Sequence, residues 1–235
     1  MAKLTEPFSA AQRLAAEALG TALLLAAVVG SGIMGERLAG GNVAIALFAN
    51  TAATGAMLFV LITIFGPISG AHFNPAVSVV AALQRNITWS VCAAYIAAEV
   101  TGAVVGVAAT HLMFEMPIVQ LSLKQRSGAA QLFSEFVATF GLITCILATV
   151  RFAPSRVAAA VASYITAAYW FTASTSFANP AVTLARSISD TFAGIRPIDA
   201  PAFIVAQLCG ALAAMLVVSW LLSSRDRPAG EKNGA

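Results

Sequence analysis

The sequence predicts an all-α membrane protein with six transmembrane helices and two re-entrant half-helices in an inverted repeat. Three observations predict this fold: an apolar composition, a set of hydrophobic stretches of two lengths, and a pattern that occurs twice. Of the 235 residues, 59% are hydrophobic and 10% are charged, whereas soluble domains carry roughly 25% charged residues. A soluble chain of this size could not bury so much apolar surface, so lipid must be the main solvent.

The hydrophobic stretches fall into two length classes. A membrane span needs about 20 largely apolar residues, and six stretches are long enough: Gln12–Met34, Asn42–Phe65, Thr88–Phe114, Ala130–Phe152, Arg156–Ala173 and Ala200–Ser223. Two further segments, Ser69–Leu83 and Ser176–Ile188, are too short to cross and contain prolines. Half-length segments of this kind are typical of re-entrant elements.

An even number of spans places both termini on one side of the membrane. We expect that side to be the cytoplasm and the membrane to be the cell (inner) membrane, because basic residues concentrate on the cytoplasmic side. The inside would carry Lys3, Arg13, Arg85, Arg151, Arg156, Arg225, Arg227 and Lys232, and the outside Arg37, Lys124, Arg126, Arg186 and Arg196. We expect no cleavable signal segment before the first span, because Lys3, Glu6 and Arg13 leave no short apolar region that ends in a cleavage site.

A repeat divides the single domain, residues 1–235, into two halves, residues 12–114 and 130–223. Asn74-Pro75-Ala76 resembles Asn179-Pro180-Ala181, which begins 105 residues later. The segment that begins at Ala98 resembles the one that begins at Ala206. Each half contains three spans and one short segment. Because three is odd, the halves have opposite orientations, and their special residues should meet near the midplane.

Each Asn-Pro-Ala triplet has the features of a helix start. Asn is a good N-cap, and Pro is tolerated at the first helical position. Two half-helices that enter from opposite faces would bring their positive N-terminal ends together. The side-chain amides of Asn74 and Asn179 could then donate to the oxygen of a passing solute, while protons and cations meet an electrostatic barrier.

These residues give the chain a resemblance to the aquaporin and aquaglyceroporin (major intrinsic protein) superfamily. The motif is Ser69-Gly70-Ala71-His72-Phe73-Asn74-Pro75-Ala76-Val77, supported by Glu17, Glu135, Gly102 and Gly210. The resemblance implies a passive channel and a homotetramer with one pore per subunit.

The resemblance also implies roles for single residues. Glu17 and Glu135 would hold the backbone of the re-entrant loops, although intramembrane carboxylates are also compatible with a proton relay. His72 would line the cytoplasmic vestibule of the pore. Glu99 stands where many members have Gln, which leaves its role open.

Four side chains narrow the pore in this family, and the usual offsets from the triplets place them here at Thr54, Ala167, Ser176 and Val182. The set contains no aromatic residue and no Arg, and Val182 follows the second triplet where the family usually has Arg. A wide filter follows. It is compatible with a loosely selective water channel, with a channel for solutes bulkier or less neutral than glycerol, or with a pore closed by another side chain.

Arg186 lies on the same helical face as Val182, one turn further out, about 6 Å along the axis. It could move the positive charge to the outer mouth of the pore and attract anions. A solvated arginine at the rim, or an ion pair with Asp190, would explain it equally well.

The filter resembles that of bacterial aquaglyceroporins associated with arsenic-resistance operons. Those channels also have Val after the second triplet and Thr in the second span. The resemblance implies passage of water, glycerol-like polyols and arsenite, as neutral As(OH)₃, with methylated or pentavalent arsenicals as further candidates.

Other functional classes find little support in the sequence. No His, Cys or carboxylate set has metal-ligand spacing, and no nucleophile–base pair, phosphate loop or redox motif occurs, so we expect no enzyme, cofactor or metal. Scattered basic residues do not predict nucleic-acid binding, and the expected partners are small solutes and lipid. A coupled secondary transporter, which also uses inverted repeats, would differ by uphill flux, and a structural membrane protein by negligible flux.

Overall fold

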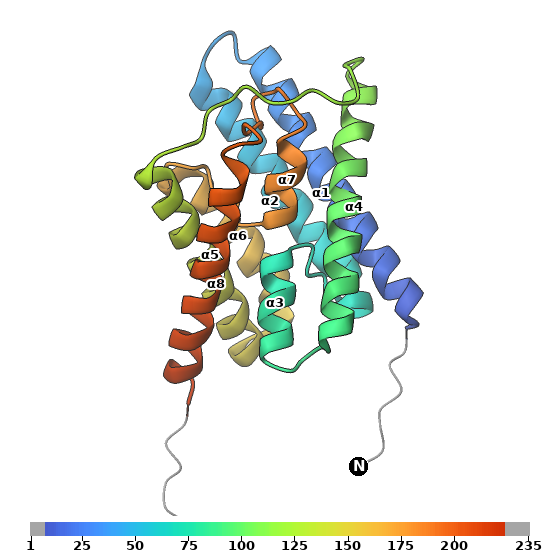
Figure 1. Cartoon of the computed structure of the whole chain (residues 1–235), viewed down its shortest axis with the longest axis vertical. Helices are drawn as coiled ribbons and strands as arrows, with labels where there is room; N and C mark the ends of the chain where they lie inside the picture. The colour runs from blue at the N-terminus through green and yellow to red at the C-terminus, as the bar shows by residue number, and fades with distance from the viewer. Residues whose placement is uncertain (1–7, 224–235) are drawn as a thin grey trace, which may run out of the picture.

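The computed structural model describes residues 8–223, and all regular structure in this range is helical. The elements are α1 (Ala10–Leu38), α2 (Val43–Ser69), α3 (Pro75–Leu83), α4 (Trp89–Met113), α5 (Ala129–Phe152), η1 (Pro154–Arg156), α6 (Val157–Phe171), α7 (Pro180–Arg186) and α8 (Ala200–Leu221). The long helices run side by side around the two short helices α3 and α7 (Figure 1). This arrangement is the predicted all-α membrane fold.

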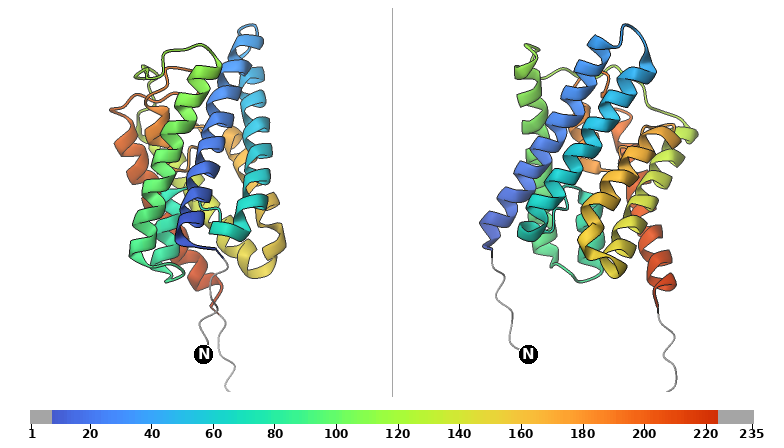
Figure 2. Two further views of the ribbon diagram at one scale, coloured as in Figure 1. Left: turned by 90° about the vertical axis from the view of Figure 1, so that its right-hand side faces the viewer. Right: turned by 180° about the vertical axis from the view of Figure 1, so that it is seen from behind.

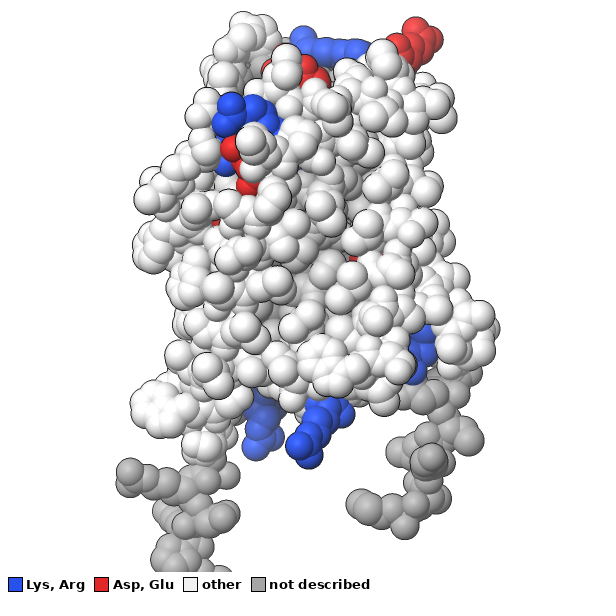
Figure 3. All heavy atoms as spheres, viewed as in Figure 1, with Lys and Arg blue, Asp and Glu red and all other residues white. Residues whose placement is uncertain are grey.

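Five of the described helices, α1, α2, α4, α5 and α8, are long and apolar enough to cross a membrane. The sixth predicted span corresponds to α6, which has only 15 residues and follows the 3-10 turn η1. Both further views show these helices along the same long axis (Figure 2). On the face drawn in Figure 3, charged side chains gather at the two ends and leave a nearly uncharged band between them, as expected for a multi-pass membrane protein.

The sequence explains where the helices begin. The side chains of Asn42 and Thr88 accept hydrogen bonds from the first turns of α2 and α4, and Ser9 forms a capping box with Gln12 at α1. Asn74 and Asn179 cap α3 and α7 in the same way, each followed by Pro at the first helical position. Only the second part of each predicted half-membrane segment is therefore helical, and irregular backbone precedes it.

Helix packing follows the two halves of the chain. Helix α1 packs against α2 and α4, and α5 packs against α6 and α8, while α2 and α6 join the halves. Two glycines allow close helix contacts: a Cβ atom on Gly102 would overlap the carbonyl of Ala18, and one on Gly210 would overlap that of Phe136. Small residues at such crossings let membrane helices approach closely.

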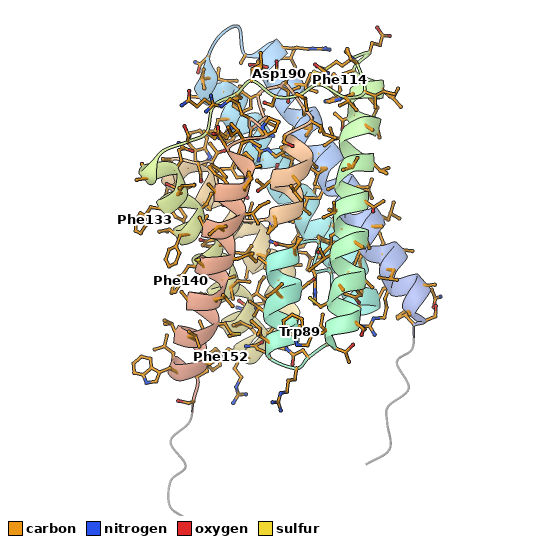
Figure 4. All side chains as sticks on the ribbon, in the orientation of Figure 1. Trp89, Phe114, Phe133, Phe140, Phe152 and Asp190 are labelled. Atoms are coloured by element: carbon orange, nitrogen blue, oxygen red, sulfur yellow. The ribbon has the colours of Figure 1, made fainter. Side chains whose placement is uncertain are left out.

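The two ends of the molecule carry different segments. The start of α1 and the end of α8 lie at the same end (Figure 1), where Trp89 and Phe152 also lie, whereas Phe114 and Asp190 lie at the other (Figure 4). Four of the basic residues in the predicted charge asymmetry, Lys3, Arg225, Arg227 and Lys232, are outside the described residues.

Candidate functional site: a channel between two half-helices

A cavity of about 260 Å³ runs between the helices and is lined by both halves of the chain. Its long helices contribute mainly apolar side chains: Leu24, Val28, Leu58, Ile62, Leu142, Ile143, Ile146, Leu147, Val150, Val157, Val161 and Ile165. Its polar groups come largely from the irregular segments before α3 and α7, residues 70–74 and 176–179. One wall thus offers apolar contact, and the other offers hydrogen-bonding groups.

The two Asn-Pro-Ala triplets meet in this cavity. The Nδ2 of Asn74 donates to the carbonyl of Ala178 at 2.8 Å, and the Nδ2 of Asn179 donates to the carbonyl of Phe73 at 2.7 Å. The Oδ1 atom of each asparagine caps its own half-helix. Since an amide nitrogen carries two hydrogens, each asparagine keeps one donor for a solute.

The backbone before each triplet is locally strained. Ala71 and Phe73 have φ angles of 51° and 49°, and their counterparts Ser176 and Ala178 have 50° and 47°. Residues other than Gly rarely adopt this left-handed conformation, and it persists only where surrounding contacts fix it. The same positive φ angles at corresponding positions indicate that both halves line the channel with the same backbone conformation.

Two buried carboxylates supply those fixing contacts. Glu17 accepts hydrogen bonds from the backbone N–H groups of His72 and Phe73 at 3.0 and 2.7 Å. Glu135 accepts from those of Phe177 and Ala178, both at 2.9 Å. Loop amides at membrane depth need such acceptors, because lipid offers none.

The structure corrects one predicted filter residue. Thr54, Ser176 and Val182 line the cavity, but Ala167 does not. It is exposed on the outward face of α6, in a shallow surface depression with Gly55 and Trp170. The reason is geometric: the family offset was counted back from Asn179 across the irregular connection 172–179, and its length shifts the helical register.

Tyr169 takes the place predicted for Ala167. It continues the channel-facing row Val157, Val161 and Ile165 at four-residue intervals, as expected for one helical face. Its hydroxyl donates to Thr54 Oγ1 at 3.3 Å. Contrary to the expectation, an aromatic residue, Tyr169, lines the cavity together with Thr54, Ser176 and Val182.

Arg186 is neither solvated at the rim nor paired with Asp190. It is 2% exposed and lines the cavity. Its Nε donates to the carbonyl of Ala193, and its guanidinium stacks on Phe177 with Cζ 3.3 Å from the ring centroid. Asp190 instead accepts from the backbone N–H of Leu123.

Two more cations, which the sequence analysis did not single out, lie beside Arg186. The guanidinium carbon of Arg126 is 4.8 Å from the Phe177 centroid, and Arg126 donates to the carbonyls of Gly194 and Ser174. Lys124 donates to the carbonyl of Phe192 at 2.6 Å. Among residues 8–223 none of the three cations forms an ion pair with a carboxylate, so no direct partner neutralises the cluster there.

His72 lines the cavity on the side of α3, and its Nδ1 lies 2.8 Å from the Ser78 hydroxyl. No group of His, Cys, Asp or Glu in the described part of the chain could hold a metal ion. The sequence held a signal for Tyr169, the four-residue spacing along α6. It held none for Lys124 and Arg126, which lie in the connection between α4 and α5.

Comparison with known proteins agrees with this architecture. The chain is 58% identical over 217 residues to aquaglyceroporin AqpS of Rhizobium meliloti (strain 1021), covering 92% of this chain and 93% of that protein. It is 33% identical to aquaporin NIP2-3 of Zea mays, covering 78% of this chain and 62% of that relative. The X-ray structure of the aquaglyceroporin from Plasmodium falciparum shares the fold, with a TM-score of 0.67 at 20% identity over 90% of this chain and 95% of that one.

The sequence also matches the major intrinsic protein family over residues 5–153 and 150–234. This match covers almost the whole chain, and it agrees with the paired half-helices and the cavity between them. The chain belongs to the major intrinsic protein family, and its aquaglyceroporin relatives are passive membrane channels for water and glycerol, not enzymes.

Proposed function

We propose that this channel conducts water, glycerol-like polyols and neutral arsenite, with methylated and pentavalent arsenicals as further solutes. The observation that carries the proposal is the cavity of about 260 Å³, whose lining includes Thr54, Ser176, Val182 and Tyr169. The Tyr169 hydroxyl is hydrogen-bonded to Thr54. Next to the ring of Tyr169, the two small hydroxyl side chains and the one aliphatic side chain leave room for solutes larger than water.

The chemistry of the cavity wall supports neutral hydroxylated solutes. Polyols and As(OH)₃ carry several hydroxyl groups, which need donors and acceptors along the path. The free amide hydrogens of Asn74 and Asn179 can donate to their oxygens, while the apolar helices contact the rest of the solute. Cations meet the N-terminal ends of α3 and α7, which carry partial positive charge.

A solute series in proteoliposomes tests the proposal. We expect stopped-flow light scattering to show passive, non-saturating flux that is high for water, glycerol and arsenite and lower for methylated arsenicals. Uphill accumulation driven by an ion gradient would indicate a coupled transporter instead. Flux equal to that of empty liposomes would remove the channel assignment.

The cation cluster extends the proposal to anionic solutes. Lys124, Arg126 and Arg186 place three positive charges around the outer end of the cavity, and Arg186 reaches its lining. Like-signed charge around an opening raises the local concentration of counter-ions. We therefore assign to Arg186 the attraction of anions, including ionised pentavalent arsenicals, at the outer mouth.

The charge of Lys124 gives this assignment a pH dependence. Burial, followed by the neighbouring charges of Arg126 and Arg186, lowers the pKa of Lys124 from 10.5 to about 8. Lys124 is thus cationic below that pH and neutral above it. We expect the ratio of monovalent-anion uptake to glycerol flux, both measured at low ionic strength and at the same pH, to fall about threefold between external pH of about 7 and about 9.

A conservative variant separates this effect from others. Lys124→Arg keeps its charge at both pH values and should show a much smaller decline of this ratio. An equal decline in wild type and Lys124→Arg would exclude Lys124 as the titrating group.

The remaining parts of the proposal concern placement and assembly. We place the channel in the cell (inner) membrane with both termini in the cytoplasm. The α3–α4 connection, which contains Arg85, and the end of α5 with η1, which contain Arg151 and Arg156, lie at the same end as the start of α1, and basic residues concentrate on the cytoplasmic side. We further propose a homotetramer with one pore per subunit. Within the single domain, residues 12–114 and 130–223 act as inverted repeats that each contribute one triplet.

A further inference from the structure

The two halves of the chain support their loop carboxylates differently. In the second half, the amide of Gln207 donates to Glu135 Oε2 at 2.6 Å and to the Thr183 hydroxyl at 2.9 Å. In the first half, Glu99 stands at the position of Gln207 and Ser78 at that of Thr183. A carboxyl group therefore occupies the place of an amide donor next to Glu17.

Glu99 is connected to the channel wall by a chain of hydrogen bonds. The Ser78 hydroxyl donates to Glu99 Oε1 at 2.7 Å, and the Ser78 Oγ lies 2.8 Å from Nδ1 of His72. His72 lines the cavity, whereas Glu99 is fully buried. Among the described residues, the side-chain hydrogen bonds that connect Glu99 to the channel pass through Ser78 and His72.

The contacts decide which of the two acids is ionised. Both oxygens of Glu17 accept backbone N–H bonds, as an anion requires. Glu99 Oε2 is buried without a hydrogen-bond partner among the described residues, which is costly for a carboxylate. Two neighbouring buried carboxyls do not both ionise. A proton on Glu99 therefore leaves Glu17 as the one anion of this pair.

We propose that Glu99, Ser78 and His72 form a proton-binding site in the channel wall, in which Glu99 is a neutral acid at neutral pH. This proposal rests on the proposed channel function, because loss of the proton is measured as a change in solute flux. His72 takes up a proton at Nε2 and releases the one on Nδ1 to Ser78. Ser78 passes its own hydrogen to Glu99 Oε1, the oxygen to which it is hydrogen-bonded, so the relay moves one proton in total and leaves His72 protonated at Nε2.

Loss of this proton changes the channel at its centre. The ionised Glu99 faces the anion of Glu17 on α1, and the backbone N–H of Asn74 is a donor to the same carboxyl. The other groups around the relay are Arg13 on α1 and Tyr95 and Cys92 on α4. Repulsion between two buried carboxylates strains the loop that carries Asn74 and narrows the path, so flux falls as pH rises.

Infrared spectroscopy of the reconstituted full chain tests the protonation state directly. Wild type should show the carbonyl band of a protonated carboxylic acid at neutral pH, and Glu99→Gln should lack it. Glu36→Gln, which changes an exposed acid, should retain it. Absence of the band in wild type, or its persistence in Glu99→Gln, would overturn the proposal even if no solute flux were detectable.

Flux and isotope exchange test the connection to the channel. Glycerol flux of wild type should fall at least about twofold between pH of about 7 and about 9. Glycerol flux of Glu99→Gln should not change over this pH range. In Ser78→Ala the hydrogen–deuterium exchange of the acid band should slow at least about tenfold, whereas Ser78→Thr, the residue of the second half, should exchange as wild type does. The same alkaline decline in Glu99→Gln, or unchanged exchange in Ser78→Ala, would contradict the relay. If wild type carries no solute but shows the band, the channel function fails and the protonated acid stands.

Discussion

Replacing Thr54 by Trp should reduce the flux of bulky solutes such as methylated arsenicals at least about tenfold and that of water much less. Thr54 is 2% exposed and lines the cavity opposite the hydroxyl of Tyr169. An indole at this position occupies the room that the small side chains leave. The measurement is the ratio of bulky-solute flux to water flux in stopped-flow experiments on the same proteoliposomes.

Ala167→Trp is the matched control for this prediction. It adds the same side chain to the outward face of α6, away from the cavity, and should leave the flux ratio unchanged. Val182→Arg is a less clear steric test, because the new cation would lie one turn from Arg186. An unchanged ratio in Thr54→Trp would place the constriction elsewhere, and a reduced ratio in Ala167→Trp would contradict the assignment of Tyr169 to the filter.

Removal of the second loop carboxylate should have the largest effect on folding. Glu135→Leu leaves the N–H groups of Phe177 and Ala178 and the amide of Gln207 without their acceptor. Each buried donor without a partner costs about 1–3 kcal/mol. We expect most of the folded protein to be lost, as measured by the monodisperse fraction in size-exclusion chromatography after detergent extraction.

Two control variants test whether the loss of folded protein is specific to this carboxylate. Glu135→Gln keeps one acceptor oxygen and should give an intermediate yield, and Glu36→Leu, at an exposed position, should give the wild-type yield. Glu135→Leu protein that folds normally and loses only transport would indicate a permeation or proton-relay role for the carboxylate instead of a supporting one.

Much of the fold could be predicted because lipid imposes simple rules on sequence. Spans must be long and apolar, and this requirement located α1, α2, α4, α5 and α8 to within a few residues. The triplets were informative because Asn and Pro each have one favoured place at a helix start. Those residues mark the start of each half-helix locally in the sequence.

The filter was less predictable because it depends on distances across irregular backbone. Ala167 and Tyr169 lie two residues apart on α6 and face opposite sides, so a small error in counting through residues 172–179 exchanges wall and surface. The four-residue row that begins at Val157 would have identified Tyr169. Arg126 had no such local signal, since its place beside Phe177 is set by the connection between α4 and α5.

The relay to Glu99 illustrates a third case. The sequence indicated that Glu99 departs from the pattern of the other half, but not what the departure does. Its meaning depends on the distance between Ser78 and the ring of His72, six residues earlier along the chain. Comparison of the two repeats therefore shows that Glu99 and Gln207 differ, and the three-dimensional structure shows which groups Glu99 contacts.

The crossed bonds of the two asparagines also constrain how the protein is made. The acceptor for Asn74 is 104 residues further along the chain, and the acceptor for Asn179 is 106 residues back. During synthesis the first three spans can enter the membrane, but the segment before α3 must wait for α7 to complete its bonds. The ribosome must therefore translate Asn179, which lies near the middle of the second half, before both bonds can form. Neither half can mature as an independent insertion unit.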